Sequence, residues 1–311
     1  MSNPDTDTPK PSLIGLASAL GAPDFADTRG AAAAPQSLRD AGLLAAIRRH
    51  GLAANWDQIF EAPTGERLPA LAALLRTLAD KTAASVEAGL LPIVIGGDHA
   101  IAAGTWRGVG RALGQAPGLI WIDAHLDAHT PESSPSGNPH GMPLAALLGF
   151  GSSAMTALDG PALDPHRIAV IGVRSFETAE ADLLQRLGVR VFTLREINRR
   201  SLAVVFADAL AIAGCAGRPF GVSIDLDAID PQEAPGVTTP VAGGLKGNEL
   251  GLALRGLLRH RQLVAFEIAE YSPIRDRDGM TAQLALALIA SASAELQAKA
   301  FPSATVNREK G

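Results

Sequence analysis

The stretch that decides the fold runs from Trp121 to Pro143 and begins Trp-Ile-Asp-Ala-His-Leu-Asp-Ala-His. It continues an apolar run, residues 119–122, that we interpret as a buried strand. Alternate residues of a strand share one face, so Asp123, His125 and Asp127 leave its carboxyl end together. Two carboxylates and an imidazole this close repel or stay unpaired unless a cation joins them. The stretch predicts a metal site, and the alternative is a strand end that carries surface charges.

Residues 12–17 read as a first buried strand. Four other apolar runs, 91–95, 168–173, 220–224 and 264–268, repeat the design of 119–122, each ending in polar residues. Helical patterns separate them, at about 37–50, 69–88, 100–113, 141–149, 176–187, 201–213, 247–259 and 280–298. Strands that alternate with helices predict parallel βαβ units, and uniformly apolar strands predict a sheet covered on both faces. Ligands of such sheets bind at the carboxyl ends of the strands, where these polar residues fall.

Composition excludes several classes of protein. The 311 residues are 47% hydrophobic and 19% charged, with a net charge of −5, which is typical of a globular α/β protein without a nucleic-acid surface. The single cysteine, Cys215, excludes an internal disulfide and makes a thiolate metal cluster very unfavourable. No apolar run approaches the length of a membrane span, and no secretory signal pattern is present, so we expect a cytoplasmic protein. We expect a disordered N-terminal tail at 1–11, one catalytic domain at 12–300 and a C-terminal tail at 301–311.

Six residues form the candidate metal set: His99, Asp123, His125, Asp127, Asp225 and Asp227. Two histidines and four aspartates suit manganese, while nickel, cobalt, iron and zinc are alternatives. Six ligands are too many for one tetrahedral site and suit two ions, which at about 3.5 Å apart lower the pKa of a shared water toward neutrality. Taken singly, Gly96-Gly97 also fits a tight turn, and the three aspartates at 225, 227 and 230 also fit a solvated loop.

Three motifs resemble the ureohydrolase family, also called the arginase/agmatinase family. They read Gly96-Gly97-Asp98-His99, Asp123-Ala-His125-Leu-Asp127 and Ser223-Ile-Asp225-Leu-Asp227-Ala-Ile-Asp230-Pro231. The resemblance spans residues 12–294 and implies a three-layer α/β/α fold with an eight-stranded, mostly parallel sheet. It also implies two Mn²⁺ ions per subunit.

In the family pattern each ligand has an assigned ion. His99 and Asp127 would hold one ion, His125 and Asp227 the other, and Asp123 and Asp225 would bridge both.

The resemblance also implies three catalytic residues. His140, in Ser-Gly-Asn-Pro-His-Gly, matches the family's proton shuttle, because imidazole can protonate a departing amine. Glu270 matches the residue that pairs with the substrate guanidinium, which a carboxylate can accept through two parallel hydrogen bonds. Asp127 would orient the hydroxide nucleophile and take its proton. The products would be urea and an amine.

The substrate loop resembles the arginase branch, with differences. Ser136 and Asn138 match residues that hold an α-carboxylate, and Glu177 and Glu180 match acids near an α-amino group. The branch normally has Asn where this chain has His129, and usually Asp where it has Glu177, and small displacements in a recognition site alter specificity. L-arginine is the first expected substrate. 4-Guanidinobutanoate or another guanidino acid is the alternative, and agmatine follows.

Two other classes of protein compete with this interpretation. A deacetylase-like hydrolase with one zinc ion would have a similar fold, but it would not need all six ligands. A non-catalytic partner subunit would lack expected ligands, and this chain has them all. The resemblance also implies a homotrimer or homohexamer, with no membrane or nucleic-acid partner.

Overall fold

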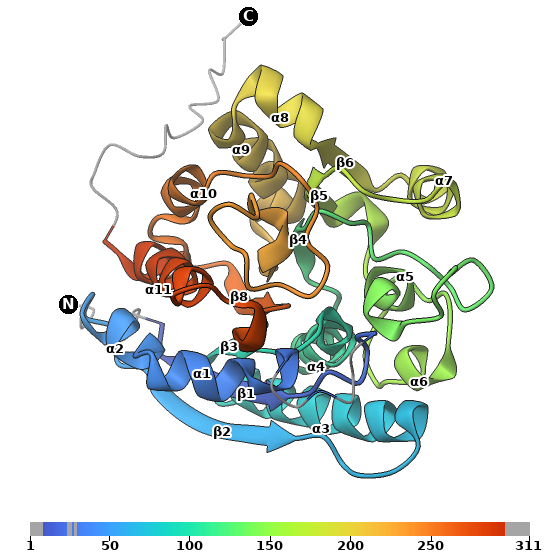
Figure 1. Cartoon of the computed structure of the whole chain (residues 1–311), viewed down its shortest axis with the longest axis horizontal. Coiled ribbons are helices and arrows are strands. Elements are labelled where there is room, and N and C mark those ends of the chain that lie inside the picture. The colour runs from blue at the N-terminus through green and yellow to red at the C-terminus, as the bar shows by residue number, and fades with distance from the viewer. Residues whose placement is uncertain (1–8, 24–26, 28–29, 296–311) are drawn as a thin grey trace, which may run out of the picture.

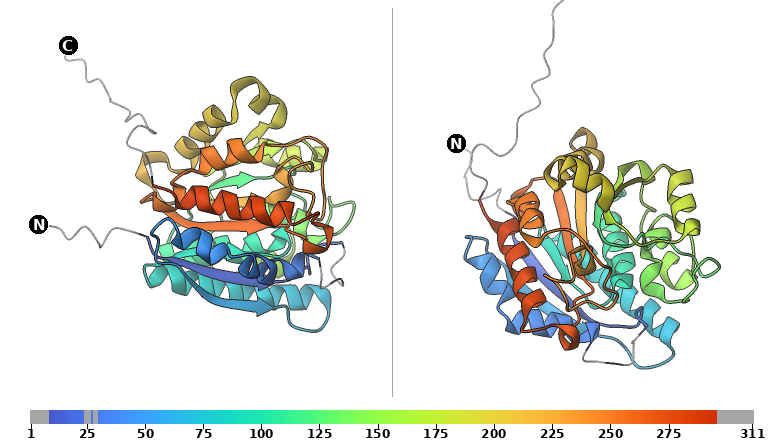
Figure 2. Two further views of the ribbon diagram at one scale, coloured as in Figure 1. Left: turned by 60° about the vertical axis from the view of Figure 1, so that its left-hand side comes forward. Right: turned by 45° about the horizontal axis from the view of Figure 1, so that its top comes forward.

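The computed structural model describes residues 9–23, 27 and 30–295. They form an eight-stranded sheet between two layers of helices, which confirms the predicted α/β/α class (Figures 1 and 2). Every pair of neighbouring strands is parallel, so the sheet is wholly parallel. The strands are β1 Pro11–Ala17, β2 Asn55–Glu61, β3 Leu91–Ile95, β4 Gly118–Ile122, β5 Ile168–Val173, β6 Arg190–Thr193, β7 Phe220–Asp225 and β8 Leu263–Ala269.

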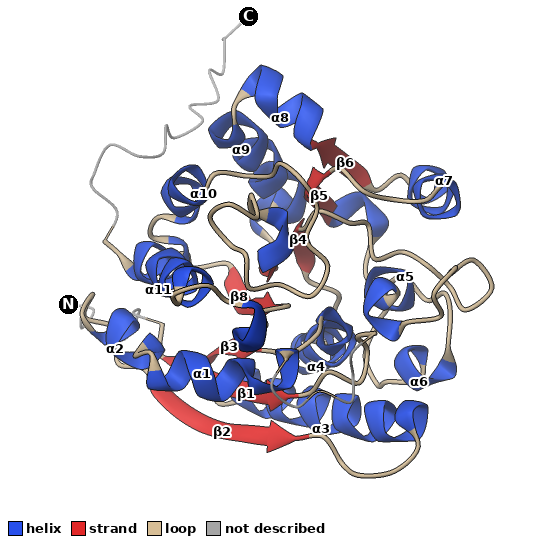
Figure 3. Ribbon diagram, viewed as in Figure 1, coloured by secondary structure: helices blue, strands red, loops and turns tan. Residues whose placement is uncertain are grey.

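The strand order places four chemistry-bearing strands together. It runs β2-β1-β3-β8-β7-β4-β5-β6, so β3, β8, β7 and β4 are neighbours in the middle of the sheet (Figure 3). Their carboxyl ends meet at one edge because all strands are parallel. That edge is therefore where the polar residues that follow these strands converge.

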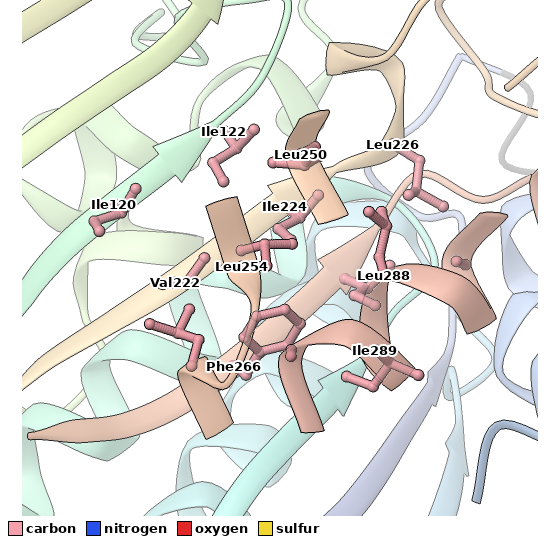
Figure 4. Close-up of a cluster of buried hydrophobic side chains, with 14 of the residues drawn as sticks. Ile120, Ile122, Val222, Ile224, Leu226, Leu250, Leu254, Phe266, Leu288 and Ile289 are labelled. Atoms are coloured by element: carbon pink, nitrogen blue, oxygen red, sulfur yellow. The ribbon is translucent and has the colours of Figure 1, made fainter. Parts of the chain in front are cut away.

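The side chains of β4 point alternately into two hydrophobic cores, one on each face of the sheet. Ile120 and Ile122 belong to the larger core, and Leu119 and Trp121 belong to a second core on the opposite face. Figure 4 shows Ile120 and Ile122 in the cluster that also holds Phe266. Burial on both faces explains why the strand is uniformly apolar, and each such side chain contributes about 1.5–3 kcal/mol.

The helices divide between the two faces. On the side of the larger core lie α1 Ala34–Asp40, α2 Leu43–Arg48, α8 Leu194–Arg200, α9 Leu202–Ala213, α10 Gly247–Leu254 and α11 Met280–Ser293. On the other side lie α3 Arg67–Glu87, α4 Ala102–Leu113, α5 Pro143–Leu147, α6 Ser153–Thr156 and α7 Thr178–Leu187. Within the described residues, no helix has both the length and the apolar character that crossing a membrane requires.

Several predicted boundaries were wrong. The helix expected at 37–50 is two helices, because Gly42 between them adopts a left-handed φ of 97°. The helix expected at 247–259 ends at Leu254, and the one expected at 280–298 ends at Ser293, while 296–298 lie outside the described residues. Pro11, expected in a tail, begins β1, whereas residues 1–8 and the expected tail at 301–311 lie outside the described residues.

Strands β2 and β6 were not predicted. Both are edge strands, each paired on one side only, and most of their residues are partly exposed. Neither therefore shows the continuous apolar run that marks the buried strands.

Candidate metal centre and active site

The six predicted ligands meet at the carboxyl edge of the sheet. They divide into two clusters whose ligand atoms lie within 4.8 Å of one another. The first holds His99, Asp123, Asp127 and Asp225, and the second holds Asp123, His125 and Asp227. Asp123 belongs to both clusters, as a bridging ligand must. By distance, Asp225 groups with the first cluster, and its Oδ1 atom accepts a hydrogen bond from the Asp227 amide at 2.7 Å, as Oδ1 of Asp123 does from the His125 amide.

Distances within the clusters show two separate ligand sets. Nδ1 of His99 lies 3.0 Å from Oδ2 of Asp127, 3.2 Å from Oδ2 of Asp123 and 3.3 Å from Oδ2 of Asp225. Nδ1 of His125 lies 3.1 Å from Oδ2 of Asp227 and 3.5 Å from Oδ1 of Asp123. The two carboxylate oxygens of Asp123 thus face different imidazoles.

Burial and crowding make Asp127 and Asp225 costly to ionise without a cation. Burial, followed by the neighbouring charge of Asp123, raises the pKa of Asp127 to about 7. Burial and the charges of Asp227 and Asp123 raise the pKa of Asp225 well above its usual value. A divalent cation would remove both penalties, because it neutralises the charges and replaces the lost hydration.

The surroundings of His99 hold its ring in a fixed orientation. Ser223 donates from Oγ to Oε1 of Glu267 at 2.7 Å, so its oxygen is free to accept from Nε2 of His99 at 2.9 Å. The ring is stacked on Trp121 at a centroid distance of 4.1 Å. Nδ1 is buried and, within the described part of the chain, makes no hydrogen bond. It faces three carboxylates, and although burial lowers the pKa of His99, they raise it well above its usual value in the absence of a cation. A cation could replace that proton, so this ring nitrogen fits a metal ligand, and the donor set fits manganese or a similar ion.

Two non-glycine residues of the site have a left-handed backbone. Asp127 has φ 49° and Glu270 has φ 65°. Backbone bonds hold both: Asp127 accepts at its carbonyl from Leu144 at 2.9 Å, and the Glu270 amide donates to the carbonyl of Gly97 at 2.7 Å. Such strain persists only where the surroundings determine the conformation, and it concentrates at functional sites.

Glu270 offers one free acceptor. Its Oε1 accepts from the backbone amide of His99 at 2.9 Å and lies 3.0 Å from Nδ1 of His140. Its Oε2 is buried and has no hydrogen-bond partner among the described residues. Burial lowers the pKa of His140, but the charge and hydrogen bond of Glu270 outweigh it and raise that pKa to about 9. The structure therefore joins the predicted proton shuttle to the predicted guanidinium acceptor.

The predicted specificity residues form a second group. His129 is buried, and its Nε2 lies 2.9 Å from Oε2 of Glu177 and 3.2 Å from Oε2 of Glu180. Its Nδ1 lies 3.0 Å from Oγ of Ser133. Glu177 and Glu180 also form the capping box of α7, so both acids serve the fold as well as the loop.

Ser136 and Asn138 lie on the same loop at lower burial. Ser136 is exposed, and its Oγ accepts from the Asn138 amide at 3.2 Å. Asn138 is partly buried, and its Oδ1 accepts from Arg67 at 3.1 Å. The loop is therefore held by side chains of the protein itself.

Several residues that support the site were not predicted from the sequence. Glu267 is fully buried in β8 and accepts from Ser223 and Thr105. A carboxylate inside an otherwise apolar strand was the signal that could have identified it. Thr239, whose Oγ1 donates to Oδ2 of Asp227 at 3.2 Å, and Arg67 carry no such signal, because their contacts are remote in sequence.

Comparison with known proteins places this site in a family. The family model described as the Arginase family matches residues 13–294. The chain belongs to the arginase family. It is 37% identical to the arginase of Brevibacillus brevis over 291 residues, which cover 90% of this chain and 96% of that one. It is likewise 37% identical to the arginase of Bacillus caldovelox over 295 residues, with the same shares covered.

A solved structure supports the same membership. The crystal structure of the arginase from Bacillus cereus superposes with a TM-score of 0.85 and 36% identity, covering 93% of this chain and 99% of that one. Membership of the arginase family makes the chain a hydrolase that acts on C–N bonds of amidines and implies a binuclear divalent metal centre. The two clusters that share Asp123 supply ligands for such a centre.

Proposed function

We propose that this chain hydrolyses L-arginine to L-ornithine and urea with two Mn²⁺ ions. The observation that carries the proposal is the pair of buried ligand clusters sharing Asp123, beside a buried carboxylate oxygen of Glu270 that has no partner among the described residues. His99 and Asp127 would hold one ion, His125 and Asp227 the other, and Asp123 and Asp225 would bridge both.

The ions supply one part of the chemistry. When bound, they lower the pKa of a water molecule toward neutrality and so provide a hydroxide nucleophile. Glu270 holds the guanidinium through Oε2, because a planar cation suits a fixed carboxylate oxygen. Asp127 orients the nucleophile and accepts its proton.

His140 completes the reaction. Its Nδ1 lies 3.0 Å from Oε1 of Glu270, whose charge favours the protonated imidazole, so His140 is placed to donate a proton to the departing amine. Water is thereby added across the C–N bond that joins the guanidinium carbon to the substrate chain. The products are urea and the free amine.

The far end of the substrate would be recognised by the loop. Ser136 and Asn138 would hold the α-carboxylate, while Glu177 and Glu180 would face the α-ammonium. One observation favours a second candidate: His129 already lies within hydrogen-bond distance of both acids. A guanidino acid without an α-ammonium, such as 4-guanidinobutanoate, needs no free acid there, and agmatine lacks the carboxylate.

A substrate panel tests the proposal. Purified protein stripped of metal and reloaded with Mn²⁺, Ni²⁺ or Co²⁺ should release urea from L-arginine faster than from 4-guanidinobutanoate or agmatine. Metal analysis should find two ions per chain. One zinc ion per chain, or no urea from any of the three compounds with any metal, would contradict it.

The proposal includes assembly as a homotrimer or homohexamer. Light scattering coupled to gel filtration should give a mass of about three or six chains. A fully active monomer would contradict the proposed oligomeric state but not the proposed reaction.

A further inference from the structure

Arg67 connects the substrate loop to the frame of the metal site. It is the first residue of α3 and is partly buried. Its Nε donates to the carbonyl of Leu20 at 2.6 Å, and its Nη2 donates to the carbonyl of Ala22 at 2.8 Å. The same Nη2 donates to Oδ1 of Asn138 at 3.1 Å. One guanidinium therefore holds a backbone segment and a loop side chain together.

The backbone segment that accepts hydrogen bonds from Arg67, residues 18–22, also makes hydrogen bonds to Asp98 and His140. The Asp98 amide donates to the carbonyl of Ser18 at 3.1 Å, and the Gly21 amide donates to Oδ2 of Asp98 at 2.9 Å. The His140 amide donates to the carbonyl of Gly21 at 3.1 Å. Asp98 immediately precedes the metal ligand His99, so this segment sets the loop position relative to the metal edge.

The contact with Arg67 decides how Asn138 is oriented. A guanidinium has donors only, so the atom of Asn138 that faces it must be the carbonyl oxygen. The NH₂ group of Asn138 then does not face Arg67, and it carries two N–H donors. Two donors suit a carboxylate and do not suit an ammonium group.

We propose that Arg67 is a positioning residue for substrate specificity: it holds Asn138 with its NH₂ group toward the substrate, so that the site selects guanidino compounds with a carboxylate at the far end. This inference rests on the proposed function, in which Asn138 contacts the substrate. Arg67 itself does not touch the substrate; it acts through Asn138.

The test compares two ligands that differ in the carboxylate. Agmatine is L-arginine without its carboxylate, so both present the same guanidinium to Glu270. Because Arg67→Ala also releases residues 18–22, which support His140, kcat should fall for both substrates, and kcat/KM should fall about tenfold or more further for L-arginine than for agmatine. Calorimetry on the Mn²⁺-loaded protein should show a similar loss of affinity for L-ornithine and none for putrescine. Arg76→Ala, an exposed arginine of the same helix, is the matched control.

A double-mutant cycle separates positioning from a general effect of charge. If Arg67 acts through Asn138, the double variant Arg67→Ala/Asn138→Ala should prefer L-arginine over agmatine no less than Asn138→Ala alone does. Equal losses for L-arginine and agmatine, or additive losses of this preference in the double variant, would overturn the inference. Asn138→Asp, which keeps Arg67 in place, should lose the preference for the carboxylate even if Arg67→Ala fails to fold; an unchanged preference would also overturn it.

Failure of the proposed function gives a different result. A wild-type protein that releases no urea from any guanidino compound contradicts that function. Preferred binding of L-ornithine over putrescine that depends on Arg67 would still support the inference about the loop. If wild type prefers 4-guanidinobutanoate, that compound replaces L-arginine in the same comparison.

Discussion

Nδ1 of His140 lies 3.0 Å from Oε1 of Glu270, so the proton donor and the guanidinium acceptor of the proposed reaction are in contact before a substrate binds. They come from distant parts of the chain, the loop after β4 and the end of β8. The backbone amide of His99 donates to the same oxygen at 2.9 Å. The Glu270 carboxylate thus contacts the backbone of the candidate metal ligand His99 and the proposed proton donor His140, and its other oxygen is left to bind the substrate cation.

The pKa of His140 should depend on Glu270. In metal-free protein we expect a midpoint near 9 by NMR titration of the imidazole. Burial lowers this pKa and the charge of Glu270 raises it. Glu270→Gln removes that charge while burial remains, so the midpoint should fall. The experiment needs a chelator, because bound cations would also lower the value. A midpoint that stays near 9 in the variant would show that another group raises the pKa.

The same shift predicts a pH-dependent stability of the metal-free protein. Because the pKa of His140 in the folded protein is raised above the ordinary histidine value of about 6.5, the stabilisation by the charged imidazole is fully present below about pH 6.5. It is lost as the pH rises through about 9. Thermal unfolding from pH 6 to 9.5 should show a smaller decline for Glu270→Gln than for wild type, and parallel curves would contradict the linkage.

Asp227→Asn should empty or weaken the second metal site. Asp227 is 1% exposed and lies 3.1 Å from Nδ1 of His125, so the variant loses a buried ligand charge. We expect about one ion per chain after dialysis and kcat lower by roughly a thousandfold or more. Asp230→Asn, in the same motif but paired with Lys246 at the surface, should keep two ions. Two tightly held ions in the Asp227 variant would rule out the ligand role.

Ser223→Ala should weaken metal binding without removing a ligand. Oγ of Ser223 lies 2.9 Å from Nε2 of His99 and donates to Glu267, which holds the imidazole with Nδ1 toward the other candidate ligands. Loss of such an outer partner typically lowers metal affinity by about 10–100-fold. Calorimetric titration of Mn²⁺ into stripped protein measures it. Ser293→Ala, a buried hydroxyl remote from the site, is the control, and equal affinities in all three proteins would contradict the role.

His129→Asn should move preference toward L-arginine. The imidazole lies between Glu177 and Glu180, and the shorter amide would leave Glu177 available for an α-ammonium. We expect the ratio of kcat/KM for L-arginine over 4-guanidinobutanoate to rise about tenfold. His166→Asn, at an exposed position, should leave the ratio unchanged. The same ratio in wild type and the His129 variant would show that His129 only packs within the loop.

The buried half of the fold could be read from the sequence. The run at 119–122 is apolar because β4 packs on both faces, and the same holds for β3, β5, β7 and β8. The edge strands β2 and β6 were not predicted, because their partly exposed residues do not form a continuous apolar run. The break at Gly42 was not predicted, because the apolar residues keep helical spacing across it although the backbone leaves the helical conformation there.

By itself, the sequence determined which residues are candidate metal ligands. Asp123, His125 and Asp127 follow a buried strand, and the carboxyl ends of parallel strands lie at one edge of a sheet, so residue type and position at strand ends predicted the set. That these residues hold ions stays a prediction. Tertiary structure alone decided the remaining contacts: the free oxygen of Glu270, the acids around His129, and the hold of Arg67 on Asn138. Arg67 and Asn138 are separated by 71 positions in the chain, and no local pattern records a hydrogen bond between segments that only folding brings together.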